Sequence, residues 1–585
     1  MNNLSILESL DQLIRKKPDL ALYRFIEQDG TVQEITPIMV DFQAKKIAAQ
    51  LQAHDSYQKP VIILYEPGCE YIFALFGCLY AGAIPVPAYP PLNEEMASTL
   101  KKIIDNSQTK LFLTNQKIKT NLRKLKLFSP LISLLGTKLN PALINVSRQL
   151  NQLEIINTSR IDDKHHAAYV KPQITSDEIA YIQYTSGSTK SPKGVVIRHS
   201  NLLANLSQLK EVAHFTEKDI YVSWLPPYHD MGLISGIFLP LYGGFRAVLF
   251  SPISFLQKPA RWLQAISTYQ GTVSGGPDFA YKMLTNKVTA EEIEGIGLSS
   301  WRLAFCGAET IEPNTFTNFH NKFSDYSLTE DIFTPCYGLA EAVVYVCSLP
   351  STAKSYYKEF NKQLLIEKHI AEIATDSSEA QKIVSVGFCP AGAQVIIADP
   401  ETKEPLTDGQ IGELWFYGPN AARSYWNNSE ESEQQLNAQL KEKSPFNYVR
   451  TGDLGFKYKE ELFITGRIKD LIIINGLNHY SQDIESSVKT GLGEIKLGNI
   501  AAFSVRTEIS ENLIILVEIK SKLNTNLSLL RQTIRELIIE KHFISPQNIS
   551  FIAAKTLPKT TSGKLKRIQC REDYLNNKFN FLESE

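Results

Sequence analysis

Short runs of apolar residues alternate with helical patterns along this chain, and this alternation limits the fold more than any other feature. Val61–Tyr65, Lys110–Thr114 and Ile179–Tyr184 have the length and composition of buried strands, and Ile72–Tyr80 has a pattern typical of a helix. Gly412–Gly418 alternates with a period of two, which favours a half-buried antiparallel strand. Strands that alternate with helices predict an α/β fold.

The length and composition exclude several classes of protein. With 585 residues, the chain is too long for one ordinary domain. Hydrophobic residues make up 43% and charged residues 21%, which is typical of a globular protein rather than a disordered or fibrous one. The 61 Lys and Arg residues balance 62 Asp and Glu residues, so we expect no binding to nucleic acid or to an anionic membrane surface.

Membrane and secretory signals are not expected in this sequence. The longest apolar stretch, Tyr71–Pro87, is broken by Gly77, Gly82 and Pro85 and is too short to cross a bilayer, so we predict no integral membrane association. Met1–Leu10 lacks the basic region and apolar core of a secretory signal. The seven cysteines are scattered and form no CxxC pair, which predicts a reduced, cytoplasmic protein.

Two segments differ from the rest of the chain and indicate its organisation. The segment 351–382 is polar and mostly helical in pattern, and we interpret it as an insertion. After Gly466 the sequence is rich in Lys and Ile and has its own pattern of strands and helices. We therefore predict a large N-terminal domain over residues 1–467, in which several subdomains pack β-sheets against helices. A small, mobile α+β domain should follow over residues 468–585.

The predicted strand Ile179–Tyr184 runs directly into a polar loop, Thr185–Gly194. Five hydroxyl side chains, two glycines and two lysines occupy this loop. Hydroxyls and backbone amides donate hydrogen bonds to phosphate oxygens, glycines allow close approach, and lysine supplies charge. The spacing does not match the loop of the P-loop ATPases. A flexible connector is the alternative, but such a polar run directly after a buried strand favours a phosphate site.

The segment Tyr184–Ile197 (YTSGSTKSPKGVVI) closely resembles the phosphate loop of the adenylate-forming enzymes. This superfamily contains acyl-CoA synthetases, luciferases, peptide-synthetase adenylation domains and fatty acyl-AMP ligases. Most members have Gly where this chain has Lys190. The resemblance implies that ATP is bound by Thr185, Ser186, Gly187, Ser188, Thr189 and Lys193. It also implies that Thr189 takes part in catalysis and in binding Mg²⁺.

Further motifs follow in the family's order and cover nearly the whole chain. Phe305–Glu309 (FCGAE) ends a strand at a turn of small residues, which let a flat base lie against the backbone. The resemblance implies that this segment borders the adenine of ATP. The contacts would be made by Gly307, Ala308 and Glu309.

Tyr337–Glu341 (YGLAE) resembles the family's YGxTE segment, with Ala340 in place of the usual Thr. Tyr337 offers a ring face for stacking on adenine. Glu341 offers a hard oxygen ligand for Mg²⁺, and the resemblance implies a catalytic role for it. The remaining nucleotide contacts would be Gly338, Leu339 and Ala340.

Two motifs lie before and at the predicted domain boundary. Arg450–Gly455 (RTGDLG) resembles the family's ribose segment, in which Asp453 would accept hydrogen bonds from both ribose hydroxyls. A turn with an Asx hydrogen bond is the alternative for this short motif. Gly466–Asp470 (GRIKD) resembles the segment that joins the two domains. There Arg467 would also contact the ribose, and Lys469 matches the hinge about which the small domain reorients.

Pro558–Lys564 (PKTTSGK) resembles the family's C-terminal lysine loop. The resemblance implies that Lys564 is catalytic and bridges the substrate carboxylate and the α-phosphate. The motif is not a Walker loop, because Pro558 stands where that pattern needs Gly. We expect Lys559 and Lys566 to be solvated, as most lysines are.

Trp224–Leu233 (WLPPYHDMGL) is close to the form found in fatty acyl-AMP ligases. The resemblance implies that His229 lies beside the substrate carboxylate and contributes to catalysis and to the substrate pocket. Asp230 could pair with an ammonium group of an amino acid, but fatty acyl-AMP ligases carry the same His–Asp pair. We therefore expect a fatty acid, with Asp230 in its pocket.

The segment Ser274–Tyr281 (SGGPDFAY) is expected to line the acyl pocket, because its small residues would leave room for a chain. A tight turn is an equally good interpretation of each residue taken singly. The predicted pocket residues here are Gly275, Gly276 and Pro277.

Two features distinguish ligases that stop at the adenylate from those that use coenzyme A. The insertion at 351–382 lies where fatty acyl-AMP ligases carry one. Asn475–Glu485 (NGLNHYSQDIE) resembles their NGRNHYPQDIE, with departures at Leu477 and Ser481. The resemblance thus implies ATP- and Mg²⁺-dependent activation of a medium- to long-chain fatty acid, with release of pyrophosphate. The acyl group would pass to an acyl carrier protein or a polyketide synthase carrier domain.

Two alternatives remain at this point. An acyl-CoA synthetase would use free coenzyme A as the acceptor. A non-catalytic nucleotide-binding protein would catalyse no pyrophosphate exchange, but the joint presence of Glu341, Asp453 and Lys564 argues against it.

Overall fold

We analysed a computed structural model of the chain. The described residues are 5–91, 94–121, 153–185, 192–350, 353, 355–442, 444–474, 477–492, 495, 497–506, 511–520, 526–542, 544–559 and 564–582. The predicted phosphate-loop residues Ser186, Gly187, Ser188 and Thr189 lie outside them.

An eight-stranded sheet forms the centre of the molecule, with the strand order β14-β13-β12-β11-β9-β10-β1-β2. Its central strands are parallel, and the edge strands β2 and β14 are antiparallel to their neighbours. The strands are β1 (Tyr23–Ile26), β2 (Val32–Ile35), β9 (Ile220–Ser223), β10 (Arg246–Phe250), β11 (Val273–Gly276), β12 (Leu303–Cys306), β13 (Phe333–Tyr337) and β14 (Cys347–Ser348).

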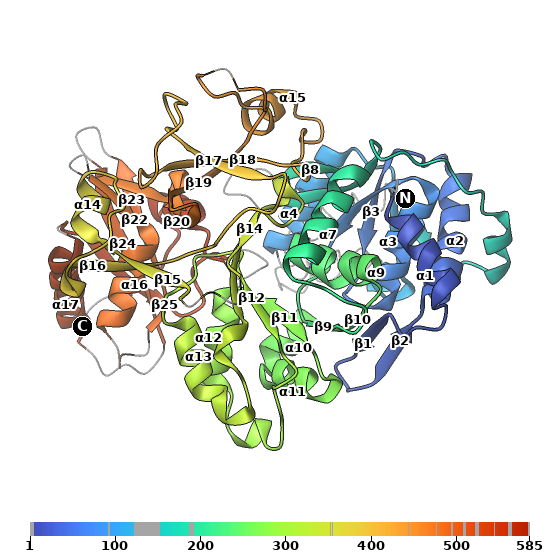
Figure 1. Cartoon of the computed structure of the whole chain (residues 1–585), viewed down its shortest axis with the longest axis horizontal. Coiled ribbons are helices and arrows are strands. Elements are labelled where there is room, and N and C mark those ends of the chain that lie inside the picture. Colours follow the sequence, from blue (N-terminus) through green and yellow to red (C-terminus); the bar gives the residue numbers. More distant parts are fainter. Residues whose placement is uncertain are drawn as a thin grey trace, which may run out of the picture.

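Helices cover both faces of this sheet because successive side chains of each strand enter different cores. Tyr221 and Ala247 join one apolar cluster, whereas Val222 and Val248 join the other. The second cluster contains α11 (Ala260–Tyr269), α12 (Asp278–Lys287) and α13 (Thr315–Phe323), which extend below the sheet in Figure 1. The first cluster contains α1 (Ile6–Lys16), α7 (His199–Val212) and α9 (Leu239–Gly243). The short helices α8 (Asp230–Leu233) and α10 (Pro252–Gln257) follow β9 and β10.

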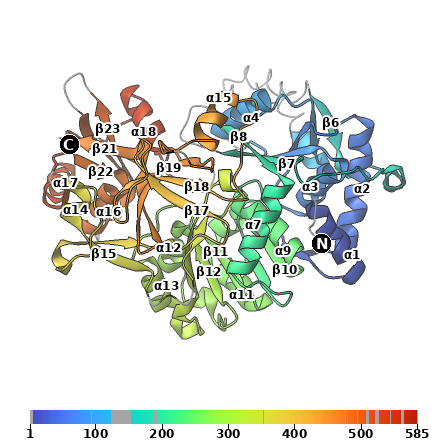
Figure 2. The same cartoon turned by 45° about the horizontal axis from the view of Figure 1, so that its top comes forward.

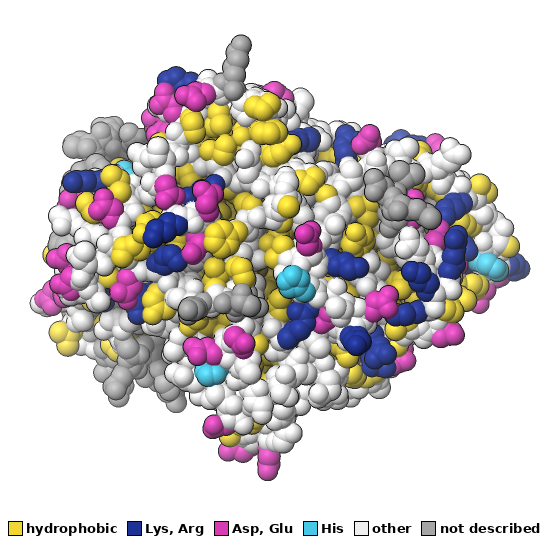
Figure 3. Space-filling view, in the orientation of Figure 1, with side chains coloured by type: hydrophobic (Ala, Val, Ile, Leu, Met, Phe, Trp, Pro, Cys, Tyr) yellow, Lys and Arg dark blue, Asp and Glu magenta, His cyan; other side chains and the backbone are white. Residues whose placement is uncertain are grey.

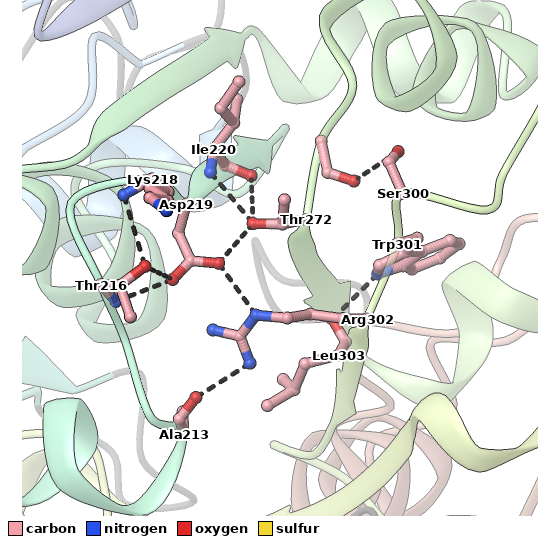
Figure 4. Close-up of polar contacts among 11 residues, drawn as sticks. Ala213, Thr216, Lys218, Asp219, Ile220, Thr272, Ser300, Trp301, Arg302 and Leu303 are labelled. Atoms are coloured by element: carbon pink, nitrogen blue, oxygen red, sulfur yellow. Dashed lines mark hydrogen bonds and ion pairs between the residues drawn. The ribbon is translucent and has the colours of Figure 1, made fainter.

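A polar network fixes the amino ends of three neighbouring strands of this sheet (Figure 4). Asp219, Thr272 and Arg302 each directly precede the first residue of β9, β11 and β12, respectively. Oδ1 of Asp219 accepts hydrogen bonds from Thr272 Oγ1 at 2.7 Å and from Arg302 Nε at 2.8 Å. Burial would raise the pKa of Asp219, but Arg302 and the hydrogen bonds outweigh it and lower the pKa. The ionised carboxylate therefore holds the three strands in register.

A second sheet is built near the N-terminus from four parallel strands in the order β4-β3-β5-β6. The strands are β3 (Pro60–Leu64), β4 (Ile84–Ala88), β5 (Leu111–Thr114) and β6 (Glu154–Asn157). One face packs on α2 (Pro37–Ala53) and α3 (Cys69–Ala81), and the other packs on α4 (Glu94–Ser107). The antiparallel pair β7 (Ile179–Thr185) and β8 (Lys193–Arg198) lies against β4. The predictions for β3, β5, β7 and α3 are confirmed.

A third, antiparallel sheet has the order β17-β18-β19-β20. Its strands are β17 (Gln394–Ala398), β18 (Gly412–Tyr417), β19 (Val449–Tyr458) and β20 (Glu461–Arg467), and α15 (Ser429–Glu431) lies between β18 and β19 in the chain. Strand β18 is antiparallel as predicted, but it is buried on both sides rather than half-buried, because both of its faces lie in apolar clusters.

The prediction that the segment 351–382 is mostly helical is wrong, because its described residues form mainly a strand pair. That the segment is an insertion stays a prediction. Strands β15 (Tyr357–Asn361) and β16 (Ala380–Val384) pair antiparallel, and among the described residues of the segment only the short α14 (Lys362–Glu367) is α-helical. Phe360 packs its ring against Phe456 and Phe463 of the third sheet, at centroid distances of 4.9 and 5.2 Å. This distant contact, which polar composition does not reveal, favours the strand.

The chain after Arg467 forms a separate apolar core (orange to red in Figure 1). A short 3₁₀ turn, η10 (Ile468–Asp470), leads to the hairpin of β21 (Leu471–Ile474) and β22 (Leu477–Tyr480). A three-stranded sheet of β23 (Leu497–Arg506), β24 (Glu511–Ile519) and β25 (Asn548–Ala553) follows. Helices α16 (Ser481–Gly491) and α17 (Leu527–His542) cover one face, and α18 (Arg567–Leu575) covers the other. We call residues 468–582 the C-terminal unit. Its mobility about Lys469 stays a prediction.

The surface agrees with the balanced charge of the sequence. Side chains of both signs are interspersed over the face in Figure 3. In the part of the chain that the structure describes, no helix is both long and apolar enough to cross a membrane.

Candidate active site

A cavity of about 2310 Å³ lies where the carboxyl ends of the central strands face the third sheet and the C-terminal unit. The site motifs meet there because parallel strands direct their carboxyl ends to one edge of a sheet. The predicted site residues that line it are Thr185, Lys193, His229, Asp230, Ala308, Glu309, Tyr337, Gly338, Leu339, Ala340, Glu341, Asp453, Arg467 and Lys564.

Asp453, the predicted ribose acceptor, is buried and held by two donors. The Tyr337 hydroxyl donates to Oδ2 at 2.6 Å, and Arg467 Nε contacts Oδ1 at 2.8 Å. The pairing of β19 with β20 places Asp453 directly opposite Arg467. Each carboxylate oxygen has two lone pairs, so the group can still accept hydrogen bonds from a diol. The structure therefore brings three of the predicted nucleotide residues, Tyr337, Asp453 and Arg467, into one contact set.

Glu341 and Lys193 both contact Tyr425, which the sequence analysis did not identify. The Tyr425 hydroxyl donates to Glu341 Oε1 at 2.8 Å. Lys193 Nζ lies 5.1 Å from the centroid of the Tyr425 ring and is paired with Glu431. Burial raises the pKa of Glu341, so a bound cation would stabilise its ionised form. An oxygen ligand facing the cavity fits Mg²⁺.

The backbone around Glu341 is strained and closely packed. Val343 follows the 3₁₀ turn that carries Glu341 and has a φ of 66°, which is rare for a β-branched residue. A Cβ on Gly338 would lie 1.7 Å from the carbonyl oxygen of Val344. The glycine of the YGLAE motif is therefore required by a backbone contact, independently of any nucleotide.

The FCGAE turn is constrained in a similar way. A Cβ on Gly307 would lie 2.6 Å from the carbonyl oxygen of Cys336. Gly307 does not line the cavity, whereas Ala308 does and has a left-handed φ of 69°. Glu309 accepts a hydrogen bond from the backbone N–H of Phe279 at 2.8 Å, and burial raises the pKa of its carboxyl.

His229 and Asp230 start the short helix α8 at the carboxyl end of β9. His229 Nδ1 lies 2.5 Å from Asp230 Oδ1, and the Met231 N–H donates to the same oxygen at 2.7 Å. Burial would raise the pKa of Asp230, but His229, this amide and Lys564 outweigh it and lower the pKa. The ionised Asp230 thus orients the imidazole that faces the cavity.

Lys564 enters the same cavity from the C-terminal unit. Burial lowers its pKa most, and Arg467 adds to this effect. Asp230, Glu309 and Asp453 act in the opposite direction, and these carboxylates come from three different elements. The structure therefore places the predicted catalytic lysine where the nucleotide and substrate motifs meet. The expectation that its neighbour Lys559 is solvated is wrong: Lys559 is partly buried, donates to Asn499 Oδ1 at 2.8 Å, and has a pKa lowered by burial.

Gly275, Gly276 and Pro277 are all buried and do not line the cavity. Phe305 fills the space beside Gly275, where a Cβ would lie 2.5 Å from the ring, and Trp224 fills the space beside Gly276. Their contact with an acyl chain stays a prediction.

Tyr425 and Glu431 carried no signal that sequence reasoning could use. Both lie outside the recognised motifs, and an aromatic residue before Trp426 has the appearance of core. Both contact β8, which follows the predicted phosphate loop, from far along the chain: an isolated bridge joins Val195 to Tyr425, and Lys193 pairs with Glu431. These contacts could be found only from the folded structure.

The segment β15–α14–β16 contacts the C-terminal unit through polar groups. Gln381 Nε2 donates to Asp483 Oδ2 at 2.9 Å, and Lys362 Nζ donates to the carbonyl oxygen of Lys541. Asn478 Nδ2 lies 3.4 Å from His369 Nε2. We call these three contacts the insertion interface.

Comparison with known proteins identifies the family. The model of the AMP-binding enzymes matches residues 11–426, and the model of the Disco-interacting protein 2-like AMP domain matches residues 469–584. The medium-chain-fatty-acid–[acyl-carrier-protein] ligase JamA of Moorena producens is 36% identical over 94% of this chain and 92% of its own length. The 4-hydroxyphenylalkanoate adenylyltransferase of Mycobacterium marinum is 33% identical over 100% of this chain and 93% of its own.

Solved structures agree with these matches. The fatty acid AMP ligase from Legionella pneumophila is 36% identical, with a TM-score of 0.74 over 99% of this chain and 97% of that chain. A fatty acyl-adenylate ligase from the same organism, in complex with acyl adenylate and pyrophosphate, is 36% identical, with a TM-score of 0.73 over 98% and 96%. The chain therefore belongs to the family of AMP-binding enzymes and is an acyl-adenylate-forming ligase of the fatty acyl-AMP ligase type.

Proposed function

We propose that this enzyme activates a medium- to long-chain fatty acid with ATP and Mg²⁺, releases pyrophosphate and transfers the acyl group to the thiol of an acyl carrier protein or a polyketide synthase carrier domain. The position of Lys564 among Asp230, Glu309 and Asp453 carries this proposal. The name of the relative from Moorena producens, a ligase of medium-chain fatty acids and acyl carrier protein, supports the substrate and the acceptor.

The first half-reaction needs charge neutralisation and no protein nucleophile. The fatty acid carboxylate attacks the α-phosphorus in line, a carboxylate–phosphorus bond forms, and the bond to the leaving pyrophosphate oxygen breaks. The ammonium of Lys564 would stabilise the negative charge that gathers on the α-phosphate oxygens. Mg²⁺, held through Glu341 with Thr189, would neutralise the triphosphate and leaving group.

The other residues bind and orient the reactants. Asp453, backed by Tyr337 and Arg467, would accept the ribose hydroxyls. His229, oriented by Asp230, would donate a hydrogen bond to the substrate carboxylate. These contacts convert the encounter of two anions into a reaction between aligned groups.

The insertion interface favours a carrier protein over free coenzyme A. Transfer to a thiol requires the C-terminal unit to turn about Lys469 and open a path to the adenylate. The three polar contacts resist that turn, and a bias of about 1.4 kcal/mol changes a population ratio tenfold. A carrier protein that binds the turned state can overcome this bias, whereas a small free thiol has less binding energy to use.

A cytoplasmic location belongs to the same proposal. All seven cysteines lie among the described residues and are free thiols. Such thiols persist in a reducing compartment.

The experiment supplies the wild type with a series of fatty acids, ATP and Mg²⁺, and follows acid-dependent ATP–pyrophosphate exchange. A second arm adds either free coenzyme A or holo-carrier protein, with the products identified by mass spectrometry. We expect exchange, retained acyl-adenylate with coenzyme A, and acyl transfer to the carrier protein. Efficient acyl-CoA formation would overturn the acceptor while leaving adenylation standing, and absence of exchange with every acid would overturn the activity.

A further inference from the structure

The hinge predicted near Lys469 is fixed on both sides by ion pairs. On the N-terminal side, Arg467 contacts Asp453 of β19 at 2.8 Å. On the C-terminal side, Arg567 Nη1 donates to Asp470 Oδ2 at 3.0 Å, and Ser481 Oγ donates to the carbonyl oxygen of Asp470 at 2.7 Å. Between these anchors the chain has only Ile468 and Lys469, so rotation must be absorbed there.

Arg567 is the centre of a buried charged cluster in the C-terminal unit. Its Nε and Nη2 donate to the two oxygens of Glu485 at 2.8 and 2.7 Å. The side chains of Arg567, Glu485 and Asp470 are 13%, 14% and 15% exposed. Glu485 Oε1 also accepts a hydrogen bond from the Ala502 N–H at 3.0 Å, which connects the cluster to β23. A guanidinium can contact two carboxylates in this forked way, and an ammonium cannot.

The same arginine is the first residue of α18 and follows Lys564 by three positions. Helix α18 packs against both η10 and β23, and Figure 2 shows it beside β21 and β23. The segment that carries Lys564 is thus attached through Arg567 to the hinge on one side and to α16 and β23 on the other.

We propose that Arg567 is the positioning residue for Lys564, joining the lysine segment and the hinge residue Asp470 into one rigid body. Rotation about Ile468 and Lys469 then moves Lys564 into or out of the cavity as a unit. This inference rests on the proposed function, because the role of Lys564 in adenylation does. Burial would lower the pKa of Arg567, but Glu485 and Asp470 outweigh it and raise the pKa, so the cluster stays charged.

The test compares Arg567→Gln, Arg567→Lys and Asp470→Asn with the matched control Arg571→Gln, an exposed arginine on the same helix. Pyrophosphate exchange should fall about ten- to a hundredfold in Arg567→Gln, because small displacements of a catalytic group have effects of that size. The KM for ATP should stay within about twofold, since the predicted ATP-binding residues all precede the C-terminal unit in the chain. Arg567→Lys should not restore the rate, and Arg571→Gln should match the wild type.

Asp470→Asn keeps the fork between Arg567 and Glu485 and removes only the charge of the contact at the hinge, so it separates positioning from folding of the unit. It should show the same change in smaller degree. Transfer from preformed acyl-adenylate to the carrier protein should be less affected than exchange in both variants. Equal losses in the two half-reactions would assign Arg567 a purely structural role and overturn the proposal.

A double-variant cycle with Lys564→Ala gives the sharpest result. If Arg567 acts through Lys564, Arg567→Gln should cause no further loss of exchange in the Lys564→Ala background. Losses that multiply would overturn the proposal.

Limited proteolysis provides a readout without catalysis. Trypsin should cleave after Lys469 faster in Arg567→Gln than in the wild type and the control, and equal rates would overturn the proposal. A wild type without pyrophosphate exchange would overturn the proposed function instead, and the proteolysis would still decide whether Arg567 holds the hinge.

Discussion

The two walls of the cavity hold their charged groups in different ways. On the N-terminal wall, Asp453 and Glu341 each accept a hydrogen bond from a tyrosine hydroxyl, at 2.6 and 2.8 Å. These pairs lie on strands and turns whose packing fixes them. On the C-terminal wall, Lys564 belongs to a separate unit that is joined to the rest of the chain through Ile468 and Lys469. In the proposed mechanism, the nucleotide is therefore recognised by groups fixed in the N-terminal part, whereas Lys564 would reach the reacting atoms through the orientation of the C-terminal unit.

The largest effect is expected from removing the side chain of Lys564. Lys564→Ala should slow adenylation on the order of a hundredfold or more, because about 3 kcal/mol of charge stabilisation is lost at phosphorus. ATP affinity, measured by calorimetry, should stay near the wild-type value. Lys520→Ala, at an exposed position of the C-terminal unit, serves as the control. Near-normal exchange in Lys564→Ala would remove this residue from the chemistry.

Removing the ribose acceptor should have the complementary effect. Asp453→Ala should raise the KM for ATP roughly ten- to a hundredfold, because contacts to a charged acceptor contribute about 1.5–3 kcal/mol. Tyr337→Phe keeps the ring and removes one hydroxyl, so its effect should be about tenfold or less. The steady-state KM for ATP distinguishes the two variants. An unaltered KM in Asp453→Ala would show that the ribose binds elsewhere.

The folded protein should lose stability in acid because of His479, which is buried in β22 of the C-terminal unit. Burial lowers the pKa of His479 from 6.5 to about 4. The unfolded state therefore binds an extra proton between these values, and stability present above pH 6.5 is lost as the pH falls towards 4. The expected slope is about 1.4 kcal/mol per pH unit. Denaturant unfolding of the wild type and of His479→Gln at several pH values measures it.

The comparison with His479→Gln matters because Asp483 acts in the opposite direction. Burial raises its pKa from 3.8 to about 6, so the folded state binds the extra proton in that window. The difference between wild type and variant cancels this contribution. His214→Asn, at an exposed histidine, should leave the curve unchanged. Parallel curves for His479→Gln and the wild type would refute the assignment.

Removing contacts of the insertion interface should allow the C-terminal unit to turn more readily and so permit some acyl-CoA formation. Shortening the segment within residues 368–379 keeps Phe360 but removes the contact of His369 and trims the same apolar core at Ala371. The ratio of acyl-CoA to retained acyl-adenylate should rise about tenfold. Gln381→Ala should move it in the same direction, and Gln363→Ala, which loses only a contact to Glu367, should not. Mass spectrometry of the products gives the ratio, and an unchanged ratio in the shortened enzyme would contradict the model.

The smallest effect is expected at Glu341, the proposed metal ligand. Glu341→Gln should raise the Mg²⁺ concentration for half-maximal exchange by about fivefold, because a neutral amide is a poorer ligand for a hard cation. The Tyr425 hydroxyl can still donate to the amide oxygen, so the local packing should persist. A titration of exchange activity with Mg²⁺ tests this, and superimposable curves would exclude Glu341 as a ligand.

Much of the site could be predicted because its motifs are local in the sequence. Asp453 and Arg467 were recognised separately, and strand pairing then brought them into contact. The strand character of 357–361 could not be predicted, because it depends on a packing partner, Phe456, far along the chain. The contacts of Tyr425 with Glu341 and Lys193 could not be predicted for the same reason.

The motif glycines show a different limit of sequence reasoning. Gly307 and Gly338 lie in nucleotide motifs, which suggested contacts with ATP. The structure shows that a Cβ at either position would collide with the backbone of a neighbouring segment. A motif records every constraint on a segment, and binding is only one of them.

The polar network at the amino ends of β9, β11 and β12 bears on how enzymes with this fold acquire new specificities. Asp219, Thr272 and Arg302 fix the amino ends of β9, β11 and β12, while loops that line the cavity leave from the opposite ends of β9 and β12. Substitutions or length changes in those loops can therefore accumulate without shifting the strands that carry them. Changes in acid specificity can then arise at one edge of the sheet while the other edge keeps the strands in place. Specificity and stability can therefore evolve separately.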